Sequence, residues 1–550
     1  MFTKFNRIFI LLCFALFITS VSIAQEVPPK TEKGLDQRIN EAFQPITEKT
    51  NDIVFFNINL FGQQVPFVVV LLGCGALFFT LAFGFVNLRR FGLAIKVVRG
   101  KFDDLEKGAE NVTSAVHSVD GDIVDTIKKE SHHGEVNHFQ ALATAVSGTV
   151  GLGNIAGVAV AIAIGGPGAT FWMIICGLLG MSSKFVECTL GVKYRDIDKN
   201  GVVYGGPMYY LKKGFAEKNL AWLGKFLAVL FAVLCVGGSL GGGNAFQSNQ
   251  AAQQIASMTG MSGSSAGFII GLVLAVITGI VIIGGIKKIA TVTEKIVPFM
   301  AIIYITASLI IIFANFSFID DAFRMIFSEA FSPRAGLGGL MGVLIVGFRR
   351  AAFSNEAGAG SASIAHSAVK TKYPASEGIV SLLEPFIDTV VICTMTALVI
   401  IMFNKDGLMF PYGGDGKGTV ILNATGAGTS GVDLTSMAYN NVIPHFSYVL
   451  TVAIVLFAFS TMISWSYYGL QAWKYLFGRG KIADLSYKFL FLAFVIIGAS
   501  VSLSAVTDFS DAMILAMVFP NMIGLLFLFP SVREELNRYL AAIKKFKSKK

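Results

Sequence analysis

Charged residues are scarce in this chain. Only 14% of its 550 residues are Asp, Glu, Lys or Arg, whereas 54% are hydrophobic and the mean hydropathy is +0.66. This balance lies outside the range of ordinary soluble domains and indicates a polytopic membrane protein. The net charge of +9 does not indicate a nucleic-acid partner, because the basic residues lie between apolar segments or in the tail, as in cytoplasmic loops.

Cysteine and histidine are also sparse. The six cysteines lie in or beside apolar stretches and form no CxxC pair, so neither a disulfide framework nor a zinc site is indicated. No HExxH motif occurs, and the six histidines are expected in loops or at the ends of spans rather than together. The sequence therefore predicts that the protein is not an enzyme and binds no cofactor.

The first residues have the pattern of a secretory signal. Lys4 and Arg7 precede an apolar run over 8–18, and small residues at 22–24 match a cleavage site. We expect a signal peptide over 1–24, followed by an extracytoplasmic segment over 25–65.

Apolar windows of about 20 residues, the length that crosses a bilayer, recur along the rest of the chain. Eleven spans are expected, at 66–88, 141–164, 169–191, 220–251, 266–285, 296–314, 337–365, 379–403, 442–473, 489–505 and 512–529. Basic residues follow the first, third and fifth spans, which predicts that these loops are cytoplasmic. We therefore expect a bacterial-type inner membrane protein with its N-terminus outside and its C-terminus inside.

Two of these spans are interrupted. SGTVGLGNIAGVAVAIAIGGP (147–167) carries a glycine cluster and Asn154 where a spanning helix should be most regular, and GFRRAAFSNEAGAG (347–360) repeats the pattern. Irregular backbone is tolerated at membrane depth only where it is buried in protein or lines a cavity, and paired interruptions are typical of transporter binding sites. Without the first span, ten remain, and each set of five opens with a broken helix, which predicts an inverted repeat.

The predicted organisation follows from these segments. After the signal and the extracytoplasmic segment come an additional transmembrane helix (66–88), a cytoplasmic linker (89–138), two five-helix repeats (139–314 and 337–530) and a basic cytoplasmic tail (531–550). The fold class is an all-α polytopic membrane protein.

Four motifs resemble the alanine or glycine:cation symporter family. They are GTVGLGNIAGVAVAIAIGGPGATFWM (148–173), GGPMYYL (205–211), FSNEAGAGSASIAH (353–366) and LEPFIDT (383–389). The resemblance covers 66–528 and implies a LeuT-type fold with one additional N-terminal helix. It also implies sodium-coupled import of a small neutral amino acid, so that the amino acid, sodium and the lipid bilayer are the expected partners.

The resemblance places both ligands at the first break. The string GLGN (151–154) also resembles the first helix of neurotransmitter:sodium symporters, which implies substrate contacts at Gly151, Leu152, Gly153 and Asn154, and a sodium site that includes the carbonyls of Ser147 and Val150. An unwound helix offers free amides and a half-helix dipole to a carboxylate, and free carbonyls to a cation. Two other interpretations exist. Gly153 and Gly157 also match a tight helix-packing motif, and 151–156 matches a dinucleotide fingerprint, although no strand–turn–helix unit surrounds it.

The second break is more polar. Substrate contacts are expected from the carbonyls near Gly347 and Phe348 and from the side chains of Phe353, Ser354 and Asn355. Charged groups inside a membrane normally face a cavity or a partner. We therefore expect Arg349 or Arg350 to pair with Glu356.

Two further helices are expected to complete the site. Asn244, Gln247 and Ser248 share one helical face by their spacing, so that Gln247 contacts the substrate or the three side chains bond between helices. On the ninth span, Trp465 is expected to cap the substrate, and the hydroxyls of Ser460 and Thr461 are expected at the sodium ion, a hard ion that prefers oxygen ligands. Proton coupling, a preference for glutamine or serine, and a passive channel remain alternatives.

Overall fold

The computed structural model describes residues 35–60, 62–107, 134–198, 201–261, 263, 265–331 and 339–548. The expected signal peptide over 1–24 lies outside these residues. Within them, long helices form the body, and the strands occur only as three short antiparallel pairs.

The N-terminal segment forms a helix and a hairpin. α2 (Leu35–Val54) leads into β1 (Asn57–Leu60), which pairs with β2 (Gln63–Pro66) and is followed by α3 (Phe67–Ala82). α2 is amphipathic, and Phe43 on its buried face packs edge-on against two phenylalanines of the helical body. The helix is therefore fixed to the body by apolar contact.

The first half of the body runs from α4 to α16 and contains one sharply bent helix. In chain order its elements are α4 (Val86–Arg89), α5 (Phe91–Val98), α6 (Asp103–Lys107), α8 (His138–Thr149), η2 (Gly153–Gly157), α9 (Val158–Gly165), α10 (Gly168–Lys193), β3 (Asp196–Ile197), β4 (Val203–Tyr204), α11 (Pro207–Ala216), α12 (Ala221–Leu240), η3 (Gly241–Ala245), α13 (Phe246–Thr259), α14 (Ala266–Ile282), α15 (Gly285–Ala314), η4 (Phe316–Phe318) and α16 (Ile319–Ala330). The chain bends by 50° between α8 and the helical segment that starts with η2. This bend confirms the interruption predicted from the glycine cluster.

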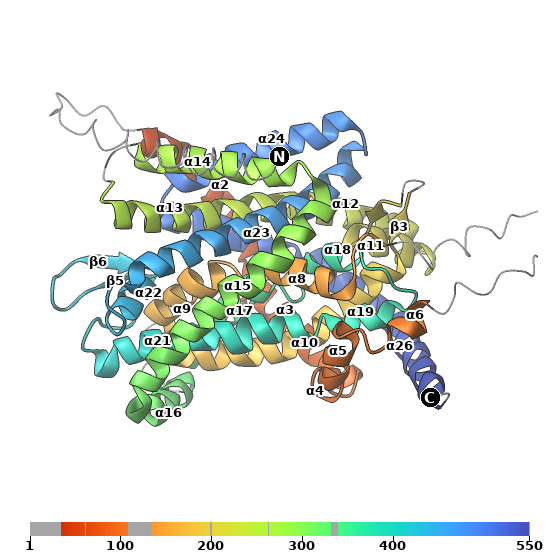
Figure 1. Cartoon of the computed structure of the whole chain (residues 1–550), viewed down its shortest axis with the longest axis horizontal. Helices are drawn as coiled ribbons and strands as arrows, with labels where there is room; N and C mark the ends of the chain where they lie inside the picture. The colour runs from red at the N-terminus through yellow and green to blue at the C-terminus, as the bar shows by residue number, and fades with distance from the viewer. Residues whose placement is uncertain are drawn as a thin grey trace, which may run out of the picture. The chain divides into compact units, whose positions relative to one another are not determined.

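The second half opens with another interrupted helix. Its elements are α17 (Gly339–Asn355), α18 (Ala362–His366), α19 (Pro374–Val380), α20 (Leu383–Pro385), η5 (Phe386–Cys393), α21 (Thr394–Phe403), η6 (Lys405–Gly407), β5 (Thr419–Ile421), β6 (Gly428–Ser430), α22 (Gly431–Asn440), α23 (Phe446–Phe477), α24 (Lys481–Ser500), α25 (Leu503–Ala516) and α26 (Val518–Ser548). The helix leaves its regular path between α17 and α18. Short elements gather at the two ends of the long helices, with α16, β5, β6 and α22 at the left of Figure 1 and α5, α6, α11 and α19 at the right.

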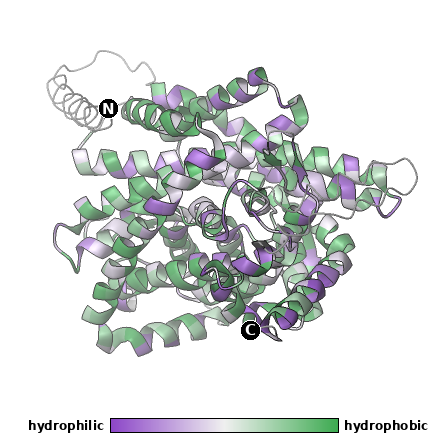
Figure 2. Cartoon of the chain, turned by 45° about the vertical axis from the view of Figure 1, so that its right-hand side comes forward, coloured by the Kyte–Doolittle hydropathy of each residue, from purple (hydrophilic) through white to green (hydrophobic). Residues whose placement is uncertain are grey.

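Seven helices of the described residues are long and apolar enough to cross a membrane. They are Gly168–Lys193, Ala221–Thr259, Gly285–Ala314, Pro374–Phe403, Phe446–Phe477, Lys481–Ser500 and Leu503–Ser548. The bent pair His138–Thr149 and Gly153–Gly165 passes the same test together, and Phe67–Ala82 and Ala266–Ile282 are shorter apolar helices. Figure 2 shows mainly hydrophobic colour along the helices of the body. The chain is thus a helical polytopic membrane protein, while the count of 11 spans stays a prediction.

One predicted span has the wrong boundaries. The window 489–505 runs across a break, because α24 ends at Ser500 and α25 begins at Leu503. Ser502 is the N-cap of α25, and its side chain accepts a hydrogen bond from the backbone of Ala505. Hydropathy does not detect such a break, because the capping serine alternates with apolar residues in GASVSLSAV (498–506), and the window stays apolar on average.

Candidate functional site

The first broken helix unwinds over three residues. α8 ends at Thr149, Val150 leaves the helical region (φ −75°, ψ 88°), and the π-helical turn η2 begins at Gly153. The exposed backbone groups have side-chain partners. The Gly151 amide donates to Asn154 Oδ1 at 2.9 Å, and the Leu152 amide donates to Gln247 Oε1 at 2.9 Å. Buried backbone polar groups need such partners, so Asn154 and Gln247 stabilise the unwound backbone of the first break.

A buried carboxylate connects the two breaks. Asp388, in the π-helical segment η5, accepts hydrogen bonds from Asn154 Nδ2 at 2.6 Å and from Ser354 Oγ at 2.8 Å. Its neighbour Thr389 donates to it at 2.7 Å and accepts from Asn355 Nδ2 at 2.9 Å. Asp388 is fully buried, and none of the cationic side chains of the described residues forms an ion pair with it. The sequence pattern did not indicate this residue as part of the site, although it lies in the motif LEPFIDT (383–389).

The second break starts at Glu356, later than the sequence predicts. α17 is continuous from Gly339 to Asn355, and the chain then turns through positive φ at Glu356 (55°), Gly358 (91°) and Gly360 (89°). Positive φ is easy for glycine and unusual for other residues. Glu356 is held there by hydrogen bonds from Trp465 Nε1, at 2.9 Å, and from the Ser361 hydroxyl.

A small cavity lies between the two breaks. It has a volume of about 10 Å³ and is lined by Gly148, Thr149, Gly153, Gly242, Gln247, Phe353, Glu356, Trp465 and Ile514. A cavity of this size holds about one water molecule. The structure therefore brings four of the predicted substrate residues to one cavity, namely Gly153, Gln247, Phe353 and Trp465, while Asn154, Ser354 and Asn355 lie beside it in the network around Asp388.

The oxygens predicted for sodium lie where α8 meets α23. Thr461 Oγ1 donates to the Ser147 carbonyl at 3.0 Å, and Ser147 Oγ donates to the Ser460 carbonyl at 2.8 Å. A Cβ atom on Gly151 would lie 2.3 Å from Thr461 Oγ1, so the break and α23 are in close contact. The Ser460 hydroxyl instead donates to the Phe457 carbonyl of its own helix at 3.0 Å. Ser147, Gly151 and Thr461 thus come together, whereas the Ser460 side chain points elsewhere.

The structure bears on two alternatives from the sequence: the role of the polar face with Asn244, Gln247 and Ser248, and the helix-packing interpretation of Gly157. Asn244 Nδ2 donates to the Phe491 carbonyl at 2.7 Å, and Ser248 Oγ donates to the Ala245 carbonyl at 3.1 Å. Asn244 therefore bonds between helices, Ser248 bonds within its own helical segment, and Gln247 alone of the three lines the cavity. A Cβ atom on Gly157 would have no atom within 4 Å, which does not fit a tight helix-packing motif.

Gly347 and Phe348 do not lie at the second break. A Cβ atom on Gly347 would lie 2.6 Å from Trp172 Cβ of α10, and the Phe348 ring packs on Trp172 and against Gly73 of α3. Both residues belong to the continuous part of α17. The expectation of free carbonyls there is wrong, because the glycine that precedes the two arginines lets α17 approach α10 rather than unwinding the helix.

The arginines of α17 pair with α25 rather than with Glu356. Arg349 Nε donates to Asp511 Oδ2 at 2.7 Å, its Nη2 lies 3.7 Å from Asp508, and Arg350 also pairs with Asp511. The predicted pairing with Glu356 is wrong, since Glu356 follows the end of the helix. The ion cluster ties α17 to α25 one helical turn away from the cavity.

A second polar network lies at the other end of α8. His138 bridges Glu106 at 3.1 Å and Glu377, and His366 bridges Glu377 at 2.6 Å and Glu384 at 3.3 Å. Glu384 continues to Lys184 Nζ of α10 at 3.0 Å. His138 and His366 lie at helix ends, as expected, but they are not apart, because both contact Glu377 and each imidazole is buried between two carboxylates.

The family model and the similar proteins point to the same family. The family described as the sodium:alanine symporter family matches residues 47–550. A sodium/alanine symporter of Methanococcus maripaludis is 40% identical over 472 residues, which cover 86% of this chain and 93% of that protein. A putative sodium/proton-dependent alanine carrier protein of Bacillus subtilis is 36% identical, covering 74% and 81%. A probable sodium/glutamine symporter of the same organism is 34% identical, covering 74% and 78%.

Proposed function

Because this chain belongs to the sodium:alanine symporter family, we propose that it is a secondary active transporter that imports alanine or glycine together with sodium by alternating access. The family is one of transporters, so the protein is not an enzyme. The observation that carries the proposal is that Asn154, just after the first break, and Ser354, just before the second, both bond to one buried carboxylate, Asp388, beside a small cavity. Broken helices in two halves of a chain are the usual place for substrate and ion in secondary transporters.

Substrate binding is assigned to residues of both breaks. We propose Gly151, Leu152, Gly153, Asn154, Gln247, Phe353, Ser354, Asn355 and Trp465 for this role. A substrate carboxylate would take the place of Gln247 Oε1 at the Leu152 amide, and the Glu356 carboxylate supplies the negative charge that an ammonium group needs. Phe353 and Trp465 are the bulky walls of the cavity, which favours a small side chain over glutamine.

Sodium is assigned to the contact between α8 and α23. The carbonyls of Ser147 and Val150 and the hydroxyl of Thr461 supply oxygens from both sides, and uncharged oxygen ligands suit a hard monovalent ion. No sodium ligand is assigned to the Ser460 hydroxyl, because it bonds within its own helix.

Topology and location are part of the proposal. Eleven spans in a LeuT-type inverted repeat, a cleaved signal peptide over 1–24 and an inner-membrane location with the C-terminus inside agree with the charge pattern of the loops. On this assignment α2 and the hairpin β1–β2 lie on the outer face, and α5, α6 and the C-terminal part of α26 (531–548) lie toward the cytoplasm.

An imposed ion gradient tests the function. In proteoliposomes that contain the full chain, an inward sodium gradient is expected to drive labelled alanine above its equilibrium level, and a proton gradient alone is not. Accumulation against a gradient excludes a passive channel, whereas uptake indifferent to sodium would contradict the proposal.

Asp388 favours one alternative coupling ion. An ionised carboxylate without a cationic partner is costly to bury, so it needs a bound cation or a proton. One relative is named a putative sodium/proton-dependent alanine carrier. Proton-coupled uptake is therefore the second candidate, and in the same assay it would appear as alanine accumulation driven by an inward proton gradient without sodium.

Thr461→Ala is expected to raise the sodium concentration for half-maximal uptake about two- to tenfold. The variant loses the hydroxyl that contacts the Ser147 carbonyl, an interaction of about 0.5–1.5 kcal/mol. Ser460→Ala is the matched control, since its hydroxyl bonds within α23, and it is expected to keep the wild-type sodium dependence. Uptake measured against sodium concentration checks both variants. Equal behaviour of the two would remove Thr461 from the sodium site.

A further inference from the structure

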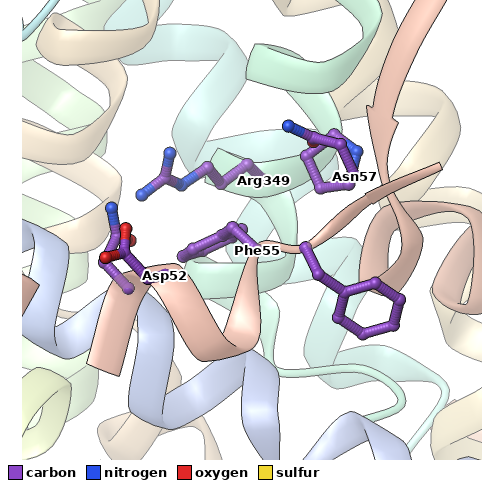
Figure 3. Close-up of a pocket in the computed structure, with 7 residues that line it drawn as sticks. Asp52, Phe55, Asn57 and Arg349 are labelled. Carbon is purple, nitrogen blue, oxygen red and sulfur yellow. The ribbon is translucent and has the colours of Figure 1, made fainter. Parts of the chain in front are cut away.

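A second, larger cavity lies between the N-terminal segment and α17. Its volume is about 490 Å³, and its lining residues are Asn51, Asp52, Phe55, Phe56, Asn57, Pro66 and Arg349. This volume lies within the range of small-molecule sites in proteins. Figure 3 shows Arg349 extending over Phe55 toward Asp52, with Asn57 on the opposite side. The cavity therefore presents an acidic and a basic group on opposing elements, α2 and α17.

The wall formed by the N-terminal segment is held in place. The Thr47 hydroxyl of α2 donates to the Ala505 carbonyl at 3.4 Å, and Asn40 Oδ1 accepts from the Ser502 amide at 2.9 Å. At the far end of the segment, the Phe56 ring stacks on Phe519 of α26. The cavity is thus a feature of packed elements rather than of a free loop.

Arg349 keeps binding capacity on the cavity side. Its Nε is bonded to Asp511, and its guanidinium lies 4.2 Å above the Phe55 ring. A guanidinium carries five N–H donors, and its side chain is 28% exposed. It forms no ion pair with Asp52 within 4 Å among the described residues, although both line the cavity. Donors toward the cavity therefore stay available for an anionic group.

Acceptors for a cationic group lie on α2. Asp52 is exposed to the cavity, and the neighbouring Asn51 Oδ1 is a buried oxygen with no hydrogen-bond partner among the described residues. Because Asp508 and Asp511 already balance the arginines of α17, a simple anion gains little net charge attraction here. A ligand that brings both a carboxylate and an ammonium group satisfies Arg349 and Asp52 together.

The larger cavity and the small cavity lie about one helical turn apart along α17. Arg349 is one helical turn before Phe353 on α17, and Asp511 is one turn before Ile514 on α25, and both Phe353 and Ile514 line the small cavity. Arg350 pairs with Asp511 and lies 5.3 Å from the Phe353 ring. The ion cluster and Phe353 thus lie between the residues that line the two cavities.

We propose that the cavity between α2 and α17 is an outer docking site for α-amino acid zwitterions, in which Arg349 binds the carboxylate and Asp52, with Asn51, binds the ammonium group. The site rests on the proposed amino-acid transport and precedes the inner site. Since its volume far exceeds that of the inner cavity, it accepts larger side chains, including that of leucine. A charged cleft of this kind raises the local substrate concentration.

Leucine and two of its singly charged analogues test the site. In proteoliposomes with the full chain, leucine is expected to inhibit labelled alanine uptake more strongly than 4-methylpentanoate, which lacks the ammonium group, or 3-methylbutylamine, which lacks the carboxylate. Asp52→Asn is expected to weaken inhibition by leucine about two- to fivefold, as for an exposed charge pair, and to leave inhibition by 4-methylpentanoate unchanged. Glu48→Gln, an exposed acid one turn earlier on α2, is the matched control and is expected to behave as wild type.

Equilibrium binding separates this proposal from the proposed function. Binding of labelled leucine to the purified full chain is expected to weaken in Asp52→Asn by the same factor and to stay unchanged in Glu48→Gln, even if transport itself fails. Asn51→Ala is expected to weaken leucine binding as well. Leucine binding that is equal in wild type and Asp52→Asn would overturn the docking site, as would inhibition by 4-methylpentanoate equal to that by leucine, which would indicate a plain anion site.

Discussion

Gly151→Ala is expected to lower sodium-driven alanine uptake about 10- to 100-fold. A Cβ atom at this position would lie 2.3 Å from Thr461 Oγ1 and 3.0 Å from Gln247 Oε1. Thr461 is buried and β-branched, so its side chain has little freedom to move away. The added methyl group would push the first break away from α23, and overpacking of this kind costs about 1–3 kcal/mol. Initial uptake rates in proteoliposomes check the result.

Gly157→Ala is the matched control for this change. It lies six residues later in the same segment, with helical backbone angles (φ −64°, ψ −36°) and no atom within 4 Å of the added Cβ. We expect wild-type uptake, because alanine is a better helix former than glycine and meets no neighbour here. If Gly151→Ala transports like Gly157→Ala, the close contact between the break and α23 has no role in binding.

Asp388→Asn is expected to reduce alanine uptake at least about tenfold, the effect of losing hydrogen bonds to a charged group of about 1.5–3 kcal/mol. The carboxylate accepts from Asn154, Ser354 and Thr389 at the same time. An amide at this position offers one acceptor oxygen in place of two, so its NH₂ group would face either Asn154 Nδ2, a donor, or the Ser354 and Thr389 hydroxyls, which would have to accept instead of donate. The two breaks would lose their common acceptor, and the negative charge that needs a cation would disappear.

Uptake under separate sodium and proton gradients checks this variant. Asp320→Asn, at an exposed acid in the first turn of α16, controls for the loss of one carboxylate and is expected to keep wild-type rates. Because Asp388→Asn removes the charge, the sodium concentration for half-maximal uptake is expected to rise in whatever transport remains. A variant with normal rates and normal sodium dependence would show that the breaks are joined without Asp388.

Several features were predictable from the sequence because they depend on local backbone chemistry. The glycine cluster before Asn154 cannot form a regular spanning helix without partners, and the structure bends there by 50°. The glycines Gly358 and Gly360 take positive φ at the second break, for which glycine is the favoured residue. Gly347, in contrast, serves close packing against α10. Glycine permits both positive φ and close helix packing, and the position of the neighbouring helix determines which of the two applies.

Side-chain partners were less predictable. Arg349, Arg350 and Glu356 are neighbours in sequence, yet the arginines pair with Asp511, which is more than 150 residues away, while Glu356 bonds to Trp465. Nothing local distinguishes an arginine that pairs within its own segment from one that pairs across the bundle. The same holds for His366, which an exposed loop or a buried network would accommodate equally well until α19 and α20 supply their carboxylates.

The sequence by itself determined the membrane class, the family resemblance, the first break and the segment that contains the second, since hydropathy, motif order and glycine content are properties of short segments. Only the tertiary structure decided that Asp388 joins the breaks, that Thr461 rather than Ser460 faces the first of them, and that Asp52 and Arg349 share a cavity. These groups come from elements far apart in the chain, and their proximity follows from how the helices pack rather than from any local preference. The role of a buried charge or of a hydrogen-bond donor therefore depends on which groups the helix packing brings next to it.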